Sequence, residues 1–546
     1  MKFKKLLHLG LALTALGSFG ATLLSAKSTA QAVSNQTFTR MEKDTIQSMD
    51  PSMIVDAISG QANLDTMDGL YRYNGKNIEP AIATDVVKPT NDGKTYTIKL
   101  RHDAKWSNGD PVTANDFVFA WRRTVDPKTG SQYAYLFEPV ANAKDIMNKK
   151  KPVSALGIKA LDKYTLQIDL TQAVPYFNSL LAFQTFFPQN EKFVKKAGKK
   201  FGTTSKYSLS NGPFVLKGWT GTNNTWTEVK NKNYWNAKAV KLNKIKVQVV
   251  KDPSTALNLY QSNKLDDAIL TGENAQQMRK DPAFVPRKQS RTTYIEMNQK
   301  KLPEFKNEKL RQGLSLAINR EEMVKKVLGD GSIVADNATP QGIMENPSNG
   351  KDFAADAKAQ DEAADNFDKA KAKALFNEGL KEVGKKKITV TLLHDDTDSA
   401  KKLAEYLQSA WQQALPNLKV TLNSVPFKTR VTRSTNGQFQ MVLGGWQADY
   451  PDPISFLDLF TTNNDYNFGK WSNSDYDKLV EASKTTDALD PQARYNDLMK
   501  AQTLLTNTQG VIPLYQTVEA HLVNKKVKDL KYSPQNTYNF VGTYIK

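Results

Sequence analysis

One short segment combines residue types that could bind a charged ligand: residues 444–456, with the sequence GGWQADYPDPISF. The paired glycines let another backbone approach closely, because they carry no side chain. Trp446 and Tyr450 offer rings with polar edges, and Asp449 is a carboxylate in this aromatic setting. In a cleft wall it would pair with a cation, while backbone groups bind an extended ligand. The alternative is a strand-to-loop junction with Asp449 as a turn residue, which spacing alone favours.

The rest of the 546-residue sequence shows little sign of a catalytic or metal-binding site. The chain has no cysteine, which excludes disulfides, thiolate metal sites and cysteine nucleophiles. Its four histidines are far apart, and no P-loop, G-x-S-x-G or H-E-x-x-H pattern is present. Two carboxylates converging across a cleft, as in glycosidases, are left open by the sequence. We expect neither an enzyme nor a metal or cofactor.

The composition is strongly basic. Lys and Arg number 75 against 56 Asp and Glu, a formal net charge of +19. No recognised nucleic-acid module accompanies this charge, so we expect no nucleic-acid partner. The simplest interpretation is a solvated lysine-rich surface; a second is attraction to an anionic cell wall or membrane surface.

The first 32 residues have the features of a secretory signal peptide. Lysines at the start precede an apolar run over residues 6–24, and small residues stand at Ala30 and Ala32. This pattern predicts cleavage after Ala32, with an uncleaved membrane anchor as the alternative. No later stretch is long and apolar enough to span a membrane. We therefore expect an exported protein that is soluble or held at the cell surface.

Strands and helices alternate in the second half of the chain. Periodicity predicts strands at 388–393, 418–425 and 441–445, with a helix at 399–415 between the first two. This order is typical of an α/β protein with partly parallel sheets. A surface helix is expected within residues 352–383, on an apolar stripe of Phe367, Ala370, Ala374 and Leu375. Further strands are predicted at 94–100, 166–170, 225–229, 244–250 and 294–297, and helices at 113–121, 252–261, 307–318, 475–483 and 491–506.

Five blocks of sequence resemble one family, the extracellular family 5 solute-binding proteins of ABC importers for oligopeptides. They are residues 79–127, 210–235, 307–328, 445–456 and 512–516, which include WSNGDPVTANDFVFAWRR, SNGPFVLKGW and IPLYQ. The blocks occur in the family's order and cover essentially the whole mature chain. They are specific for the family and much less so for the ligand.

The resemblance implies a bilobal, hinged α/β fold of the periplasmic-binding-protein type (type II, cluster C) that closes on its ligand. The first lobe would comprise 33–58, 205–298 and 513–546. An additional domain would fill 59–204, and the second lobe 299–512.

The resemblance also implies a function and a site. The protein would capture oligopeptides between its lobes, as a monomer, and deliver them to an ABC permease and its ATPase. Asp449, in the motif W-x-A-D-Y, would pair with the α-ammonium of the peptide. Gly445, Trp446 and Gln447 would line the cleft beside Tyr450, with backbone groups pairing to the peptide as to an added strand.

Two departures from the family pattern bear on specificity and location. Some peptide-binding members carry an arginine for the peptide carboxylate where this chain has Ser434; the nearest arginine is Arg433, which we take as the candidate. Peptide length therefore stays open. Without cysteine the chain cannot carry the usual lipid anchor. We expect retention by charge on a Gram-positive surface, or a periplasmic protein in a Gram-negative cell.

Two other functions compete with peptide capture. The same fold could bind an oligosaccharide, a metal chelate or haem; the scarce histidines argue against metal, and eight tryptophans keep sugars open. A different class is a charge-retained surface adhesin that has lost transport coupling, which the basic charge and absent cysteine motivate.

Overall fold

The computed structural model describes residues 36–75, 77–360, 366–535 and 537–546. Residues 35–546 form one compact unit. The predicted signal peptide lies outside the described residues. Over the described ranges, no helix combines the length and apolarity needed to cross a bilayer.

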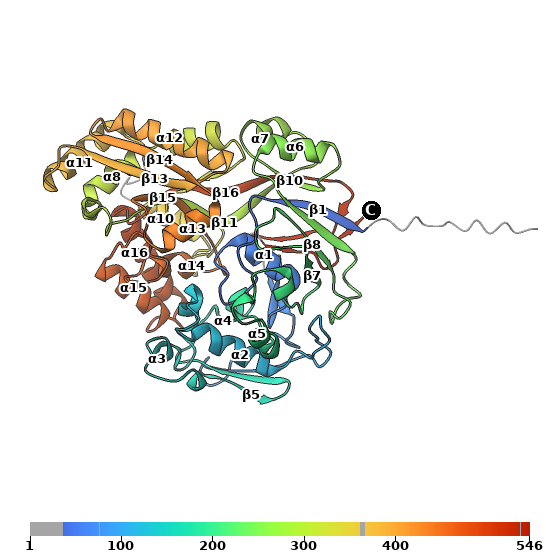
Figure 1. Cartoon of the computed structure of the whole chain (residues 1–546). Coiled ribbons are helices and arrows are strands. Elements are labelled where there is room, and N and C mark those ends of the chain that lie inside the picture. The colour runs from blue at the N-terminus through green and yellow to red at the C-terminus, as the bar shows by residue number, and fades with distance from the viewer. Residues whose placement is uncertain (1–35, 76, 361–365, 536) are drawn as a thin grey trace, which may run out of the picture. The chain divides into compact units, whose positions relative to one another are not determined.

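An eleven-stranded mixed sheet organises the molecule (Figure 1). Strand β1 is parallel to β9 and β10, and β13 is parallel to β14 and β15; the other pairs are antiparallel. The neighbours in space come from distant parts of the sequence. The order is β14 (Leu418–Val425), β13 (Ile388–Asp395), β15 (Met441–Gln447), β11 (Phe284–Met297), β16 (Ile512–Val523), β10 (Asp267–Leu270), β1 (Thr37–Glu42), β9 (Lys244–Val249), β8 (Thr225–Lys230) and β7 (Phe214–Lys217), with β12 (Ile333–Val334) added beside β16.

The long antiparallel pair β11–β16 joins the two halves of this sheet. Its register runs from Phe284 opposite Leu522 to Ile295 opposite Ile512. Between Lys288 and Thr292 the register shifts, because β16 supplies fewer residues there than β11. Such bulges bend a strand and re-aim its side chains. This bulge lies beside the cavity described below.

Helices cover the sheet at its β13–β14 end and over β10. Helix α12 (Asp398–Ala414) packs on β13 and β14, with Leu403, Leu407 and Trp411 buried. Its Trp411 indole donates a 2.9 Å hydrogen bond to the Leu314 carbonyl of α8 (Glu308–Leu316). Further along the strand order, α6 (Pro253–Gln261) packs on β10, between β16 and β1. Further helices are α1 (Ala57–Thr66), α13 (Phe427–Thr435), α15 (Ser474–Lys484) and α16 (Pro491–Asn507).

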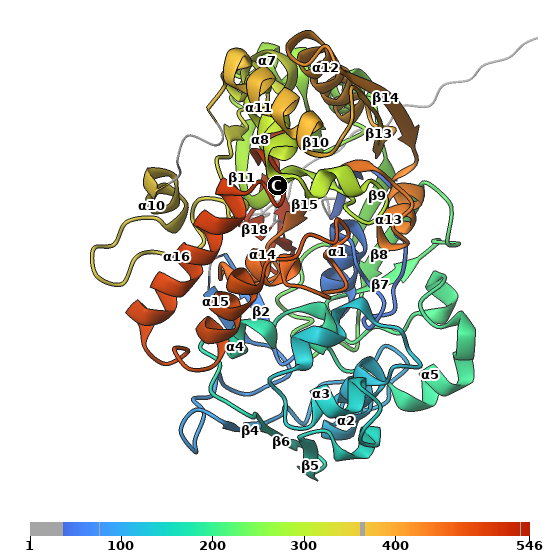
Figure 2. The same ribbon diagram turned by 90° about the vertical axis from the view of Figure 1, so that its left-hand side faces the viewer.

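A second, smaller sheet lies within residues 59–204. It has the order β4 (Thr95–Lys99), β6 (Thr165–Asp169), β5 (Ile158–Asp162), and α2 (Ala114–Val125) packs against it. Figure 2 shows these elements together, far from the β13–β14 end of the main sheet. A capping box between Thr113 and Asp116 begins α2, as its sequence predicts. The other short elements are α3 (Ala143–Met147), α4 (Phe177–Leu180), α5 (Glu191–Ala197), α7 (Gly272–Met278), α9 (Arg320–Glu322), α14 (Ile454–Leu457), β2 (Tyr71–Asn74), β3 (Asn77–Pro80), β17 (Val527–Lys528), β18 (Lys531–Ser533), β19 (Thr537–Asn539) and β20 (Tyr544–Ile545).

Most predicted elements are confirmed within a few residues. The strand predicted at 294–297 is only the end of the longer β11, and one other element is wrong in form. Residues 352–383 hold two helices, α10 (Phe353–Gln360) and α11 (Lys369–Glu382), where one was expected. The predicted stripe is also out of phase, since Phe367, Ala370 and Ala374 are exposed. Helix α11 instead buries Ala372, Phe376, Gly379 and Leu380 against α8. Alanine-rich, lysine-rich sequence carries too weak a pattern to fix which face is buried.

Candidate functional site

A cavity of about 380 Å³ lies where β1, β11, β15 and β16 meet the start of α1 and the face of α13. This volume falls in the range of sites for small organic ligands. The 59–204 region contributes Gln132, Tyr133 and Phe183 to its wall. Every part of the chain that was expected to form a lobe or domain therefore supplies lining residues.

Four of the predicted site residues line this cavity: Gly445, Trp446, Gln447 and Asp449. Tyr450 does not belong to the lining. Its ring is buried and stacks on Tyr176, with the ring centroids 4.9 Å apart.

Arg433 also lies outside the lining, although its helix borders the cavity. Helix α13 presents Phe427, Arg430, Val431 and Ser434 to the cavity, at the spacing of one helical face. Arg433 precedes Ser434 and therefore points about a quarter-turn or more away. The arginine that the helix does present, Arg430, is paired with Asp395 at 3.0 Å.

Strand β15 keeps one edge available beside the cavity. Residues Gly444–Gln447 pair with β11 on one side. On the other side β13 pairs with β15 at Met441 and Val442, and the pairing among described residues goes no further. A methyl group on Gly445 would lie 2.6 Å from the Thr292 carbonyl oxygen, so only glycine fits this close pairing. The free edge can accept an added strand.

Asp449 is a buried carboxylate with a free oxygen. Its residue is 8% exposed, and the Tyr133 hydroxyl donates a 3.0 Å hydrogen bond to Oδ1. The Asp449 amide donates to Ser455 Oγ at 2.9 Å, which fixes the start of the following turn. No described group bonds Oδ2. Burial raises the pKa of Asp449 well above its usual range, and the Tyr133 bond only partly opposes this.

Aromatic rings surround Asp449. Trp446 and Tyr466 lie 4.6 Å apart by ring centroid, and Tyr133 lies 5.2 Å from Tyr466. These rings shield the Asp449 carboxylate from solvent. Several polar atoms nearby are buried as well. Buried polar atoms that lack a described partner include Trp446 Nε1, Gln447 Oε1, Tyr466 OH, Ser434 Oγ and Thr517 Oγ1, all in residues of the lining. Because such atoms are costly when unpaired, this concentration indicates a polar ligand.

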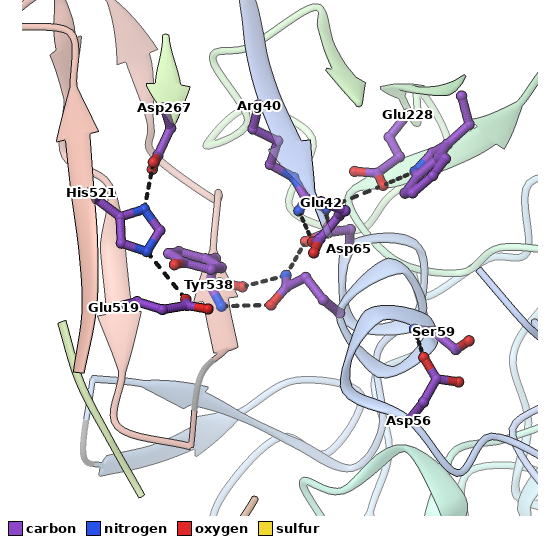
Figure 3. A network of polar contacts seen from close by, with 12 residues as sticks. Arg40, Glu42, Asp56, Ser59, Asp65, Glu228, Asp267, Glu519, His521 and Tyr538 are labelled. Carbon is purple, nitrogen blue, oxygen red and sulfur yellow. Dashed lines mark hydrogen bonds and ion pairs between the residues drawn. The ribbon is translucent and has the colours of Figure 1, made fainter. Parts of the chain in front are cut away.

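Most other charges of the cavity wall are paired. Figure 3 shows Arg40 beside Glu42, Asp65 and Glu228, and His521 between Asp267 and Glu519. Lys43 pairs with Glu519. Burial alone would raise the pKa of Asp267, but Arg287 at 2.9 Å and His521 at 2.6 Å hold it below its usual range.

Over the described ranges, no cluster of three His, Cys, Asp or Glu side chains has the geometry of a metal site. The described cavity wall offers a ligand the Asp449 carboxylate, the polar edges of aromatic rings, backbone groups of β15 and the guanidinium of Arg291.

A family model describing the bacterial extracellular solute-binding proteins, family 5, matches residues 77–468. The chain belongs to this family. Its α/β periplasmic-binding-protein-like fold class is thereby confirmed, and the family consists of solute-binding proteins rather than enzymes.

Relatives and solved structures match this chain along nearly its whole length. The dipeptide-binding protein of Lactococcus lactis is 39% identical over 92% of this chain and 93% of its own length. OppA of Listeria monocytogenes, solved bound to peptide, is 40% identical with a TM-score of 0.89, covering 94% of this chain and 99% of that one. The substrate-binding domain of an oligopeptide ABC transporter from Bacillus anthracis is 37% identical with a TM-score of 0.90. The match covers 94% of this chain and 99% of that one.

Two features of the site were missed by sequence reasoning. Tyr133 lies in a short 3₁₀ turn, Gln132–Phe137, 316 residues from its partner Asp449. Arg291 reaches the cavity through the β11 bulge. Neither has a local pattern that marks it, although the clustering of aromatics near Tyr133 was visible in the sequence.

Proposed function

We propose that this protein binds oligopeptides in the cavity and delivers them to an ABC importer. The observation that carries the proposal is Asp449: a buried carboxylate with one oxygen held by Tyr133 and the other free. An α-ammonium group supplies the opposite charge and the hydrogen bonds that this oxygen lacks. The peptide-bound relative from Listeria monocytogenes and the dipeptide-binding relative from Lactococcus lactis support this ligand class.

The peptide backbone would pair with the free edge of β15. Gly444–Gln447 offers backbone groups to an extended chain regardless of that chain's sequence. Affinity would then come from the backbone and the charged terminus, so the receptor would accept many sequences. Gly445, Trp446 and Gln447 have the cleft-lining role in this proposal.

Calorimetric titration with paired peptides tests this function. We expect trialanine with a free N-terminus to bind, and N-acetyl-trialanine to bind at least tenfold more weakly. Asp449→Asn should remove this difference, because the amide has no charge to offer the ammonium. Equal binding of both peptides to the wild type would contradict the role of Asp449. Binding of malto-oligosaccharides in place of any peptide would contradict the peptide function itself.

We further propose that the chain is exported by cleavage after Ala32 and held at a Gram-positive surface by its positive charge. Charge-mediated retention weakens with ionic strength, because ions screen it. Washing intact cells with concentrated salt should release the protein, whereas a detergent requirement would contradict charge retention.

We also propose how the chain divides. The first lobe comprises 33–58, 205–298 and 513–546, the second lobe comprises 299–512, and 59–204 forms the additional domain. We propose in addition that the protein is a monomer. Small-angle scattering tests both, since closure on trialanine should reduce the radius of gyration of a monomer-sized particle.

A further inference from the structure

Lys251 joins two parts of the chain that are far apart in the strand order of the main sheet. Its ammonium nitrogen lies 3.1 Å from Asp44 Oδ2 and 2.9 Å from Asp396 Oδ1. Partial burial alone would lower the pKa of Lys251, but hydrogen bonds to the two carboxylates raise it. The side chain is therefore a charged ammonium that is held between two acids.

The two acids reach Lys251 from different ends of the sheet. Strands β1 and β9 are parallel, with Glu42 opposite Val249, so Asp44 and Lys251 leave the sheet at the same edge. Asp396 instead follows β13, and five strands separate β13 from β9. In a flat sheet these two strands would be roughly 29 Å apart, at about 4.8 Å per strand spacing. The twist and curvature of the sheet bring their ends together, and the ion pair joins them.

The Lys251–Asp396 ion pair bridges two walls of the cavity. Asp44 lines the cavity after β1, and Asp395 and Thr397, the neighbours of Asp396, line it between β13 and α12. With the lobe boundaries proposed above, Lys251 and Asp44 belong to the first lobe and Asp396 to the second. Among ion pairs between described residues, this pair alone joins the first lobe to the second. Separation of the lobes would break it.

The described arrangement resembles that of a peptide-bound relative. The TM-score with the peptide-bound OppA of Listeria monocytogenes is 0.89. For the murein tripeptide-binding protein MppA of Escherichia coli, one structure gives 0.84 and the unliganded open form gives 0.63, at 29% and 28% identity. The contact between Lys251 and Asp396 thus belongs to an arrangement unlike the open one.

We propose that the Lys251–Asp396 ion pair forms as the lobes close on a peptide and acts as a latch that slows release of that peptide. This inference rests on the proposed function and on the proposed lobe boundaries. Asp44, in the same lobe as Lys251, keeps the ammonium in position in either arrangement. Opening must separate the ammonium from the Asp396 carboxylate, whereas a peptide that enters between open lobes meets no such contact. The latch therefore acts on the dissociation rate rather than on the association rate.

Stopped-flow fluorescence with trialanine separates the two rates, because Trp446 in the cavity wall can report binding. Lys251→Gln should release trialanine about 3- to 10-fold faster and bind it at close to the wild-type association rate. Asp396→Asn should give the same result, and the double variant should add nothing further, because all three lose the same contact. Lys251→Arg keeps the charge and should release trialanine as the wild type does. Asp398→Asn is the matched control: this acid pairs with Lys402 inside the second lobe, so its loss should not change release.

Ionic strength gives a second readout that a merely structural role would not move. Release from the wild type should accelerate between about 0.05 and 0.5 M NaCl more steeply than release from Lys251→Gln, because salt screens the ion pair. Asp396→Asn decides the question if Lys251→Gln does not fold.

Two results would overturn the latch while trialanine still binds, which leaves the proposed function in place. One is an unchanged release rate in Lys251→Gln and Asp396→Asn. The other is slower association with unchanged release, which would assign these charges to steering the ligand. Absence of trialanine binding to the wild type would instead contradict the proposed function and the latch together.

Discussion

The hydroxyl of Tyr133 donates a 3.0 Å hydrogen bond to Asp449, across 316 positions of the sequence. The tyrosine belongs to the region 59–204, and the aspartate follows strand β15 of the main sheet. Both residues line the cavity, and the bond occupies one carboxylate oxygen while the other stays free. In the proposed function, the contact leaves a single acceptor oxygen of Asp449 for the ligand. It also links the Asp449 side chain to the region 59–204, which lies outside the main sheet.

Tyr133→Phe tests whether this bond positions the carboxylate. Removing the hydroxyl leaves Asp449 Oδ1 without its donor, so the carboxylate is less fixed in place. We expect peptides with a free N-terminus to bind roughly 3- to 10-fold more weakly, the effect of one hydrogen bond. Titration calorimetry measures this change. Tyr176→Phe, a change outside the cavity lining, is the control; equal affinities for Tyr133→Phe and wild type would show that the bond has no positioning role.

Asp449 should also lower the stability of the empty protein. Its folded-state pKa is raised by burial, so ionisation opposes folding. The penalty begins as pH rises above the unfolded-state value of about 4 and is complete above the folded-state value. Asp449→Asn should therefore stabilise ligand-free protein at high pH, by about 1–3 kcal/mol once the penalty is complete, and change little below pH 4.

Urea unfolding of refolded, ligand-free protein at pH 3.5 and at pH 8.5 measures this difference. Asp452→Asn is the contrasting control, because Asp452 is paired with Arg494 at 2.7 Å and both are buried. Breaking that pair should cost stability, by about 3–5 kcal/mol. A loss of stability in Asp449→Asn at both pH values would contradict the prediction.

The sequence predicts features that depend on a few neighbouring residues, and it misses features that depend on contacts between distant segments. Alternating residues predict β14 within its observed bounds, and a capping box predicts the start of α2, because both patterns span a few positions. The W-x-A-D-Y motif is also local, and four of its five residues line the cavity while Tyr450 does not. Arg433 and Arg291 show the opposite case. Which arginine faces the cavity depends on the rotation of α13 and on a bulge set by β16, and neither is encoded near the residue itself.

Gly445 should be far less tolerant of substitution than its neighbour Gly444. A methyl group on Gly445 would lie 2.6 Å from the Thr292 oxygen and 3.0 Å from the Thr293 Cα, both backbone atoms that cannot move aside. We expect Gly445→Ala to cost about 1–3 kcal/mol in urea unfolding. A methyl group on Gly444 meets nothing within 4 Å. Gly444→Ala should be neutral or stabilise by about 0.4–1 kcal/mol, so equal losses in both variants would contradict the predicted crowding.

Glu296 provides a pH-dependent prediction with a defined window. It is buried in β11 near the cavity, and Gly469 donates a 2.6 Å backbone hydrogen bond to its Oε1. Burial raises its pKa from 4.5 to about 7, although the Gly469 bond partly opposes this. The ionisation penalty on folding therefore appears above pH 4.5, grows to pH 7 and is constant beyond. Because glutamine keeps the acceptor without the charge, Glu296→Gln should gain roughly 3 kcal/mol at pH 8 and almost nothing at pH 4.

The control for this prediction has the opposite sign. Burial alone would raise the pKa of Glu519, but Lys43 and His521 hold it below its usual range. A depressed folded-state pKa stabilises the fold above the unfolded-state value of about 4.3. Glu519→Gln should thus lose stability at pH 8 and keep most of that loss at pH 4, because the stabilisation fades only as pH falls from about 4.3 toward the lower folded-state pKa. Urea unfolding of the three proteins at both pH values separates the two effects; a gain in Glu296→Gln that is the same at pH 4 and pH 8 would show that glutamine acts by packing and not by removing a charge.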